Sequence, residues 1–146
     1  MKSDYFSIKE LVCKHVYERY GESAVMFLDD KLIETLNVIR EQILCAPMTV
    51  NNWHAGGNFT QRGLRCNICE LVKSKTDAGS LYLSAHMLGK AVDCNVEGMT
   101  AEEARRLIIA KQELLPYPIR LEDGVSWLHF DLYKNGKNEK VYLFKA

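Results

Sequence analysis

The chain has no excess of charge of either sign. Its 146 residues include 19 Lys and Arg and 19 Asp and Glu, so the formal net charge is zero. General binding to nucleic acid or to an acidic membrane surface depends on a basic excess. We therefore expect neither nucleic acid nor a membrane among its partners.

The sequence also lacks a long apolar run. No stretch approaches the roughly 20 residues that a helix needs to cross a bilayer. The start, Met1 to Tyr5, has no apolar segment typical of a signal peptide. The five cysteines are an odd number, which predicts reduced thiols in a chain without such a signal. We expect cytoplasmic synthesis with no export route of the chain's own.

Repeats, low-complexity tracts and linkers are absent, so nothing divides the chain. A length of 146 residues favours a single domain over residues 1–146. Such a chain is long enough to bury roughly two thirds of its unfolded surface. With 47% hydrophobic and 26% charged residues, its composition is that of an ordinary globular protein, and we expect a monomer.

Periodicity predicts mainly helices first and mainly strands last. Capping boxes at Ser7–Glu10 and Thr100–Glu103 open two of the helices, and Asp123-Gly124 marks a hairpin turn. The order predicts an α+β fold, with N-terminal helices packed on a mostly antiparallel sheet. Helices are predicted from Ser7 to Gly21, from Asp29 or Asp30 to about Ile43, over residues 64–75 and from Thr100 to about Leu115, and strands over 48–52, 90–96, 119–122, 126–133 and 141–145.

Two imidazoles and a carboxylate stand out in two segments of this pattern. His86 and Asp93 lie in the stretch from Ser84, and His129 lies in the stretch that ends at Asp131. Three protein ligands leave the fourth tetrahedral position of a zinc ion free for water, which separates a catalytic site from a closed structural one. A single histidine beside apolar residues is more often structural, so the argument depends on the combination.

Strand parity supports the combination. Gly89, Ala91 and Asp93 share one face of their predicted strand, which leaves room for a neighbouring strand or a metal shell. His129 and Asp131 likewise share a face with Trp127. Since metal-bound histidines donate their other ring N–H to a carboxylate or carbonyl, Asp131 is placed to orient a ligand.

The pattern Ser-x-His-x-x-Gly-x-Ala-x-Asp followed by Trp-x-His resembles the zinc D-alanyl-D-alanine peptidase family. That family includes carboxypeptidases and phage endolysins that cleave L-alanyl-D-glutamate bonds, and it shares its fold with the hedgehog signalling domain. The stretch from Phe6 to Leu11 also resembles the start of small endolysin-like members, so the resemblance covers most of the chain. It implies Zn²⁺ bound by His86, Asp93 and His129.

The resemblance also implies an arginine that binds a substrate carboxylate, ahead of the first zinc ligand. Arg62 and Arg65 follow the predicted 48–52 strand in the expected order. The guanidinium fork suits a carboxylate because it can bond to both oxygens. The Ser-Gly-Tyr-Arg sequence in which the family carries this arginine is absent. We prefer Arg62 because it follows the glycine loop directly.

The general base departs from the family pattern. Many members carry Glu or Asp three residues before the last zinc histidine, where this chain has Ser126. Glu122 and Asp123 are the candidate replacements; Asp123 matches the position of a glutamate in hedgehog-type relatives, and Glu122 has the longer reach. Asp123 is equally explained as a turn residue.

The resemblance implies a zinc metallopeptidase acting on peptidoglycan stem peptides, as a D-Ala-D-Ala carboxypeptidase or an endolysin-type endopeptidase. A phage-encoded enzyme would reach the cell wall after release from the cell. Ser126 favours an alternative, a zinc-containing peptidoglycan-binding or virion structural module without catalysis. Further substrate contacts are expected from Ser84, Trp127 and His54, the last in the glycine loop.

The remaining cysteines and histidines have simpler interpretations. Cys66-Asn67-Ile68-Cys69 is one Cys-x-x-Cys pair, and a structural zinc site needs two further ligands. No second pair exists, so two cysteines packed on a helix that buries Ile68 are the preferred interpretation. His15 is predicted to be structural or exposed, and Cys94 points away from the metal face of its strand.

Overall fold

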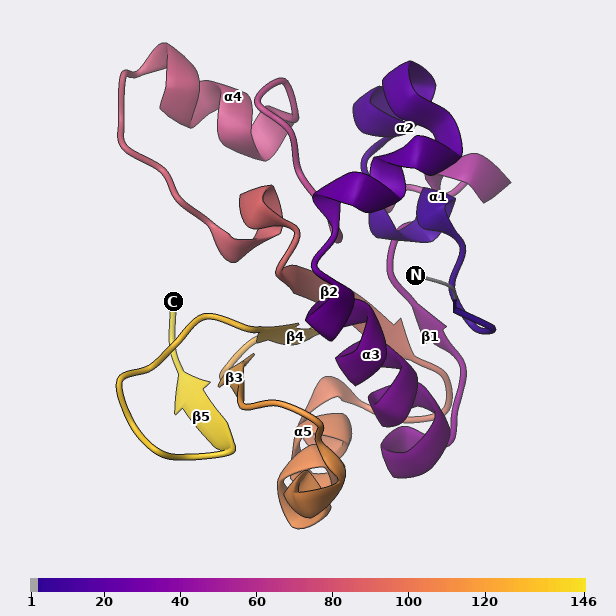
Figure 1. Ribbon diagram of the computed structural model, residues 1–146, viewed down its shortest axis with the longest axis vertical. Coiled ribbons are helices and arrows are strands. Elements are labelled where there is room, and N and C mark those ends of the chain that lie inside the picture. Colours follow the sequence, from indigo (N-terminus) through magenta and orange to yellow (C-terminus); the bar gives the residue numbers. More distant parts are fainter. Residues whose placement is uncertain (1–2) are drawn as a thin grey trace.

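The computed structural model describes residues 3–146 as an α+β fold built on a five-stranded mixed sheet (Figure 1). Met1 and Lys2, part of the start used above to argue against a signal peptide, lie outside the described residues. The strands are β1 (Met48–Thr49), β2 (Ala91–Val96), β3 (Ile119–Glu122), β4 (Leu128–Asp131) and β5 (Val141–Phe144).

The spatial order of the sheet is β1-β2-β4-β3-β5. The β1–β2, β2–β4 and β3–β4 pairs are antiparallel, and β5 pairs with β3 in parallel. The prediction of a mostly antiparallel sheet in an α+β fold is therefore confirmed. β1 is shorter than the predicted strand, because the chain turns away after Thr49 into a short helical turn.

The described chain has five α-helices and five further helical segments. The α-helices are α1 (Ile8–Leu11), α2 (Lys14–Tyr20), α3 (Asp30–Val38), α4 (Glu70–Asp77) and α5 (Ala101–Ala110), and the further segments are η1 (Gly21–Phe27), η2 (Ile39–Leu44), η3 (Trp53–Ala55), η4 (Ala85–Leu88) and η5 (Gln112–Leu114). Figure 1 shows α3 and α5 beside the strands, with α4 held out on an excursion of the chain. The predicted starts of α3 and α5 are confirmed: Asp29 caps α3, and Thr100 and Glu103 form the capping box of α5.

The two faces of the sheet differ in chemistry. Val92, Cys94, Leu128 and Phe130 are fully buried and belong to the hydrophobic core with the helices. Side chains in a strand alternate between faces, so Asp93, His129 and Asp131 lie on the opposite side. The sheet thus separates the apolar core from a group of buried polar side chains on its other face.

The predicted first helix is wrong in one respect. It divides at Val12 into α1 and α2, because the chain around Val12 is extended and pairs with Leu64. Leu64 N–H donates to Leu11 O at 2.8 Å, and Cys13 N–H donates to Leu64 O at 3.0 Å. These long-range backbone bonds replace helical ones that a local pattern would predict.

The predicted helix over residues 64–75 is also corrected. Helix α4 begins only at Glu70, with Cys69 as its N-cap, so the Cys-x-x-Cys segment precedes the helix. Ile68 is 53% exposed and is not buried by a helix. The prediction that a helix carries both cysteines is therefore wrong, although Cys69 is buried in the core and Cys66 packs against it.

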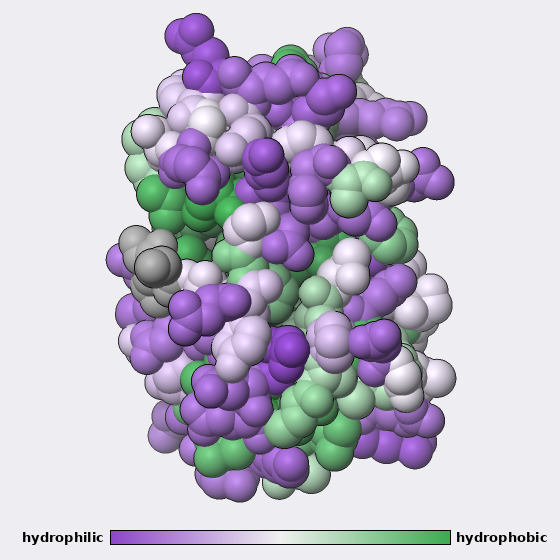
Figure 2. All heavy atoms as spheres, turned by 90° about the vertical axis from the view of Figure 1, so that its right-hand side faces the viewer, coloured by the Kyte–Doolittle hydropathy of each residue, from purple (hydrophilic) through white to green (hydrophobic). Residues whose placement is uncertain are grey.

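The surface agrees with the balanced composition. On the face that bears the N-terminal helices, hydrophilic side chains separate several smaller hydrophobic patches (Figure 2). Among residues 3–146, no helix combines the length and the apolar character that crossing a membrane requires.

Gly89 ends η4, just before β2, and its role differs from the predicted one. Its φ is +66°, and a Cβ there would overlap the backbone carbonyl oxygen of Phe27. Its own carbonyl accepts from Asp29 N–H at 3.0 Å. The glycine therefore lets the segment that carries His86 approach the N-terminal half of the chain, and it does not lie on β2 beside the carboxylate.

We expect Gly89→Ala to lower the free energy of unfolding by roughly 3 kcal/mol or more, since overlap with backbone adds to the strain of the left-handed conformation. Gly98→Ala is the matched control: φ is +76° with nothing within 4 Å of the added methyl. That change should cost about 1 kcal/mol. Urea unfolding followed by circular dichroism measures both, and equal losses would contradict the close approach at Gly89.

Candidate metal centre and cleft

Asp93 and His129 face each other across the antiparallel β2–β4 pair. They are direct partners in its register. His129 Nδ1 lies 2.7 Å from Asp93 Oδ1, and both side chains are buried. The pairing of two strands thus places a carboxylate against an imidazole.

His86 joins them from η4. The Ser84 side chain caps this turn by accepting from His86 N–H at 3.2 Å. Nδ1 of His86 lies 2.9 Å from Gly63 O, and a carbonyl can only accept, so Nδ1 carries the proton. The other nitrogen, Nε2, then faces Asp93 Oδ2 at 3.4 Å.

The donor atoms of His86, Asp93 and His129 fit a metal ion. All three lie within 4.8 Å of one another. The 3.4 Å separation is close to the ~3.3 Å edge of a tetrahedron with ligands at ~2.0 Å. The 2.7 Å contact is a hydrogen bond that a metal would replace. The three predicted ligands therefore form a cluster that could bind a metal.

Each imidazole is also oriented by its second nitrogen. Gly63 O receives His86 Nδ1–H, and Asp131 Oδ2 lies 2.9 Å from His129 Nε2. Such partners fix the tautomer and the direction of a ligating ring. Strand parity predicts this role for Asp131, and the contact agrees with it.

Arg120 is a site residue that the sequence interpretation missed. Its Nε and Nη2 donate to the two oxygens of Asp131, both at 2.8 Å. Tyr133 N–H adds a third bond to Asp131, at 3.0 Å. The signal was available in β3, where buried Ile119 and Leu121 alternate with partly exposed Arg120 and Glu122.

Hydrogen bonds outweigh burial in setting the charges. Burial raises the pKa of Asp93, but the bond from His129 and the nearby His86 imidazole hold that pKa well below its usual range. Burial lowers the pKa of His129, but bonds to Asp131 and Asp93 raise it to about 9. Bonds from His129 and Arg120 likewise lower the pKa of Asp131 against its burial. Without metal, His129 is thus an imidazolium between two carboxylates.

The cluster lies in an open cleft of about 560 Å³. Trp127, Tyr133 and Phe144 give it aromatic walls, and Ser84 also lines it. The cleft lining also includes three charged side chains, those of Glu122, Arg65 and Arg120.

The structure places the two candidate arginines differently. Arg65 lines the cleft, and its Nη2 lies 3.1 Å from Asp93 Oδ2. Arg62 is not a lining residue: its guanidinium stacks on Phe59 at 4.1 Å and donates to Asn95 Oδ1 at 3.0 Å. The preferred residue, Arg62, therefore lies outside the cleft lining, and the other candidate, Arg65, lies within it.

The two candidate bases, Glu122 and Asp123, also differ in whether they line the cleft. Glu122 lines the cleft. Asp123 does not: its Oδ1 accepts from Gly124 N–H at 2.9 Å and lies 3.8 Å from Arg105 Nε. Asp123 is therefore a turn residue, and Ser126 lines a different depression with Arg105.

His54 is also away from the cleft. It is exposed in η3, with its ring edge-on to Trp53 at a centroid distance of 5.6 Å. The neighbouring Trp53 packs on Tyr17 of α2, and His54 does not line the cleft. This position does not support the expected substrate contact from His54. Trp127 and Ser84, by contrast, lie where a ligand in the cleft would meet them.

In comparisons with known proteins, no family model, no curated protein and no solved structure matches this chain.

We expect the metal-free protein to lose stability as the pH rises from about 6.5 through about 9. The pKa of His129 is raised in the folded state, so its contribution is complete below the unfolded value of 6.5 and disappears once the folded form deprotonates. Urea midpoints in a chelating buffer measure this loss.

The control is His129→Asn, which removes the titrating group. Its midpoint should fall less over the same pH interval. An identical fall in both proteins would show that other groups, and not the imidazolium between Asp93 and Asp131, cause the pH dependence.

Proposed function

We propose that the protein is a zinc metallopeptidase that hydrolyses amide bonds in peptidoglycan stem peptides. The observation that carries the proposal is the set of three donors, His86, Asp93 and His129, on the floor of an open cleft. Two imidazoles and one carboxylate are a donor set of catalytic zinc sites, with one position left for water or substrate. The family motif that contains these residues supports the substrate class and a D-Ala-D-Ala peptidase-like fold.

When bound, the zinc ion supplies a Lewis acid and a water whose pKa falls toward ~7. The chain holds it through His86, Asp93 and His129, while Gly63 O and Asp131 keep the two rings in position. Arg120 binds both oxygens of Asp131 and so keeps that carboxylate ionised.

Glu122 is the residue that we assign as general base. Among the described cleft residues, the other carboxylate side chains are committed: Asp93 to the metal and Asp131 to His129 and Arg120. Glu122 would take the proton of the attacking water and pass it to the leaving amine.

Arg65 is assigned to the substrate carboxylate. Its Nε donates to Gln61 O at 2.6 Å, and its Nη2 donates to Asp93 Oδ2. Both bonds hold the guanidinium at the edge of the three metal-binding residues, where it would meet a carboxylate of the peptide. The aromatic walls from Trp127, Tyr133 and Phe144 would contact the apolar parts of the stem peptide.

A second candidate is a zinc-containing peptidoglycan-binding or virion structural module. Ser126 favours it, because most of the family has a carboxylate at this position in the sequence. The two candidates differ in turnover and not in binding. In either case we propose a chain made in the cytoplasm that meets the cell wall after release, as for a phage-encoded protein.

Replacing one metal ligand tests the proposal. His86→Ala or Asp93→Ala should lower the zinc content by about one ion per chain and abolish muropeptide cleavage. Elemental analysis and mass spectrometry of digested peptidoglycan measure the two effects, and the products identify the bond. Unchanged cleavage would overturn the peptidase; binding of muropeptides without turnover by the zinc-loaded wild type would favour the module.

The base is tested by a neighbouring pair. Glu122→Gln should reduce kcat by about 10²-fold or more, with zinc content unchanged. Asp123→Asn is the matched control, one residue away but outside the cleft, and should retain nearly full kcat. Similar losses in both variants would contradict the assignment of Glu122.

A further inference from the structure

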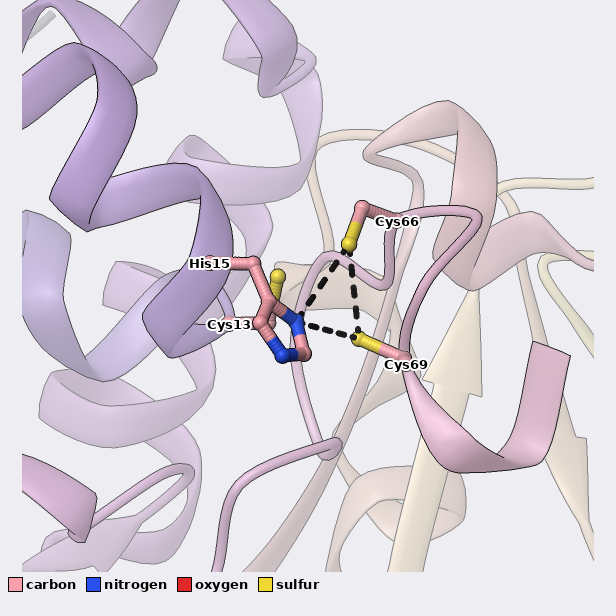
Figure 3. A group of neighbouring side chains, drawn as sticks. All are labelled: Cys13, His15, Cys66 and Cys69. Carbon is pink, nitrogen blue, oxygen red and sulfur yellow. Dashed lines mark hydrogen bonds between the residues drawn. The ribbon is translucent and has the colours of Figure 1, made fainter. Parts of the chain in front are cut away.

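Four side chains outside the cleft form a second cluster, around a common centre (Figure 3). Cys13 and His15 come from the start of α2, and Cys66 and Cys69 come from the segment before α4. Figure 3 shows the sulfur atoms and one ring nitrogen of His15 directed toward one another. The ligand atoms all lie within 4.8 Å of one another.

The backbone brings these two segments together before any side chain does. Val12 and Leu64 form a parallel bridge, and Cys13 N–H bonds to Leu64 O. A Cβ on Gly63 would overlap Leu11 O, so only glycine allows this approach. The cluster is therefore built into the fold and does not depend on flexible surface side chains meeting.

The distances among Cys66, Cys69 and His15 are those of a tetrahedral site. The two sulfur atoms of Cys66 and Cys69 are 3.8 Å apart, and His15 Nδ1 lies 3.5 Å and 3.7 Å from them. Zinc bonds of ~2.3 Å to sulfur and ~2.0 Å to nitrogen give tetrahedral edges of ~3.8 Å and ~3.5 Å. A metal fits these three ligands with little movement, and Cys13 Sγ, within 4.8 Å of each of them, supplies the fourth.

We propose that Cys13, His15, Cys66 and Cys69 bind a structural zinc ion, distinct from the metal in the cleft. Four protein ligands fill the tetrahedron and leave no position for water, so this site is closed. Three thiolates and one imidazole suit zinc, whereas Mg²⁺ and Ca²⁺ take oxygen ligands. The site was hidden in the sequence because its second ligand pair is Cys-x-His and not Cys-x-x-Cys.

Two other uses of the cysteines fit less well. A disulfide requires sulfur atoms about 2.05 Å apart, and all five cysteines are free in the described chain. A redox Cys-x-x-Cys motif needs only its own two thiols, whereas Cys13 and His15 are directed at the same centre here. Cys13 and Cys69 are each only 1% exposed, as inert ligands in a closed site would be.

The zinc ion would hold a segment with few other attachments. In α4 only Val72 is buried. Yet the residues just before it serve the cleft: Gly63 O orients His86, and Arg65 N–H donates to His86 O at 3.1 Å. A metal at the cysteines fixes one end of that segment and so keeps the support of His86 in place.

Elemental analysis of protein purified under reducing conditions tests the proposal. The wild type should contain about two zinc ions per chain, and Cys66→Ser or His15→Asn about one. These ligands are partly or fully exposed, so their replacement disturbs the core least. Cys45→Ser, at an exposed thiol away from the cluster, is the matched control and should keep both ions.

Cobalt substitution separates the two sites. Sulfur ligands give a thiolate-to-cobalt charge-transfer absorption in the near ultraviolet, and the site with His86, Asp93 and His129 has no sulfur. The band should persist in Asp93→Ala and disappear in Cys66→Ser. It therefore reports on the second site even if the peptidase proposal fails.

Alkylation of the wild type covers the case in which the variants do not fold. With zinc bound, Cys66 should react much more slowly than Cys45, and a chelator should remove the difference. Equal reactivity of the two thiols, iron in place of zinc, a Cys66–Cys69 disulfide or a cobalt protein without the sulfur band would each overturn the proposal.

Discussion

The register of β2 against β4 is the constraint on which the cleft depends. It sets Asp93 opposite His129, and it sets their neighbours Val92, Cys94, Leu128 and Phe130 into the core. Because side chains alternate, a slip of one residue would turn the charged pair into the apolar core and the apolar set out of it. Burial of the apolar set therefore fixes the register, and the register fixes the position of the charged pair.

Much of the cleft could be predicted because it follows from local rules. Period-two alternation gives the face shared by His129 and Asp131, and capping residues give the starts of α3 and α5. The fold class follows from the order of the elements. What could not be predicted depends on contacts across the chain. The break between α1 and α2 results from the pairing of Val12 with Leu64, and the different positions of Arg62 and Arg65 result from their bonds to Asn95 and Asp93.

Gly63 connects the two clusters more directly than any side chain does. Its lack of a Cβ lets the chain approach Leu11, and that approach brings the cysteines of both segments together. Its carbonyl oxygen meanwhile holds His86 Nδ1 at 2.9 Å. One peptide unit thus lies between the sulfur-rich centre and the imidazole of the cleft, so a shift of this segment would be felt at both.

The segment that contains α4 is exposed between two anchored ends. Residues 73–81 are all exposed, while Cys69 before them is buried and Leu83 after them accepts from the Tyr133 hydroxyl at 2.6 Å. Exposed backbone between two fixed ends tolerates changes of length and sequence. Leu81 and Leu83 line the cleft at its rim. Variation along this stretch would therefore change the leucine-lined part of the cleft and leave His86, Asp93 and His129 in place.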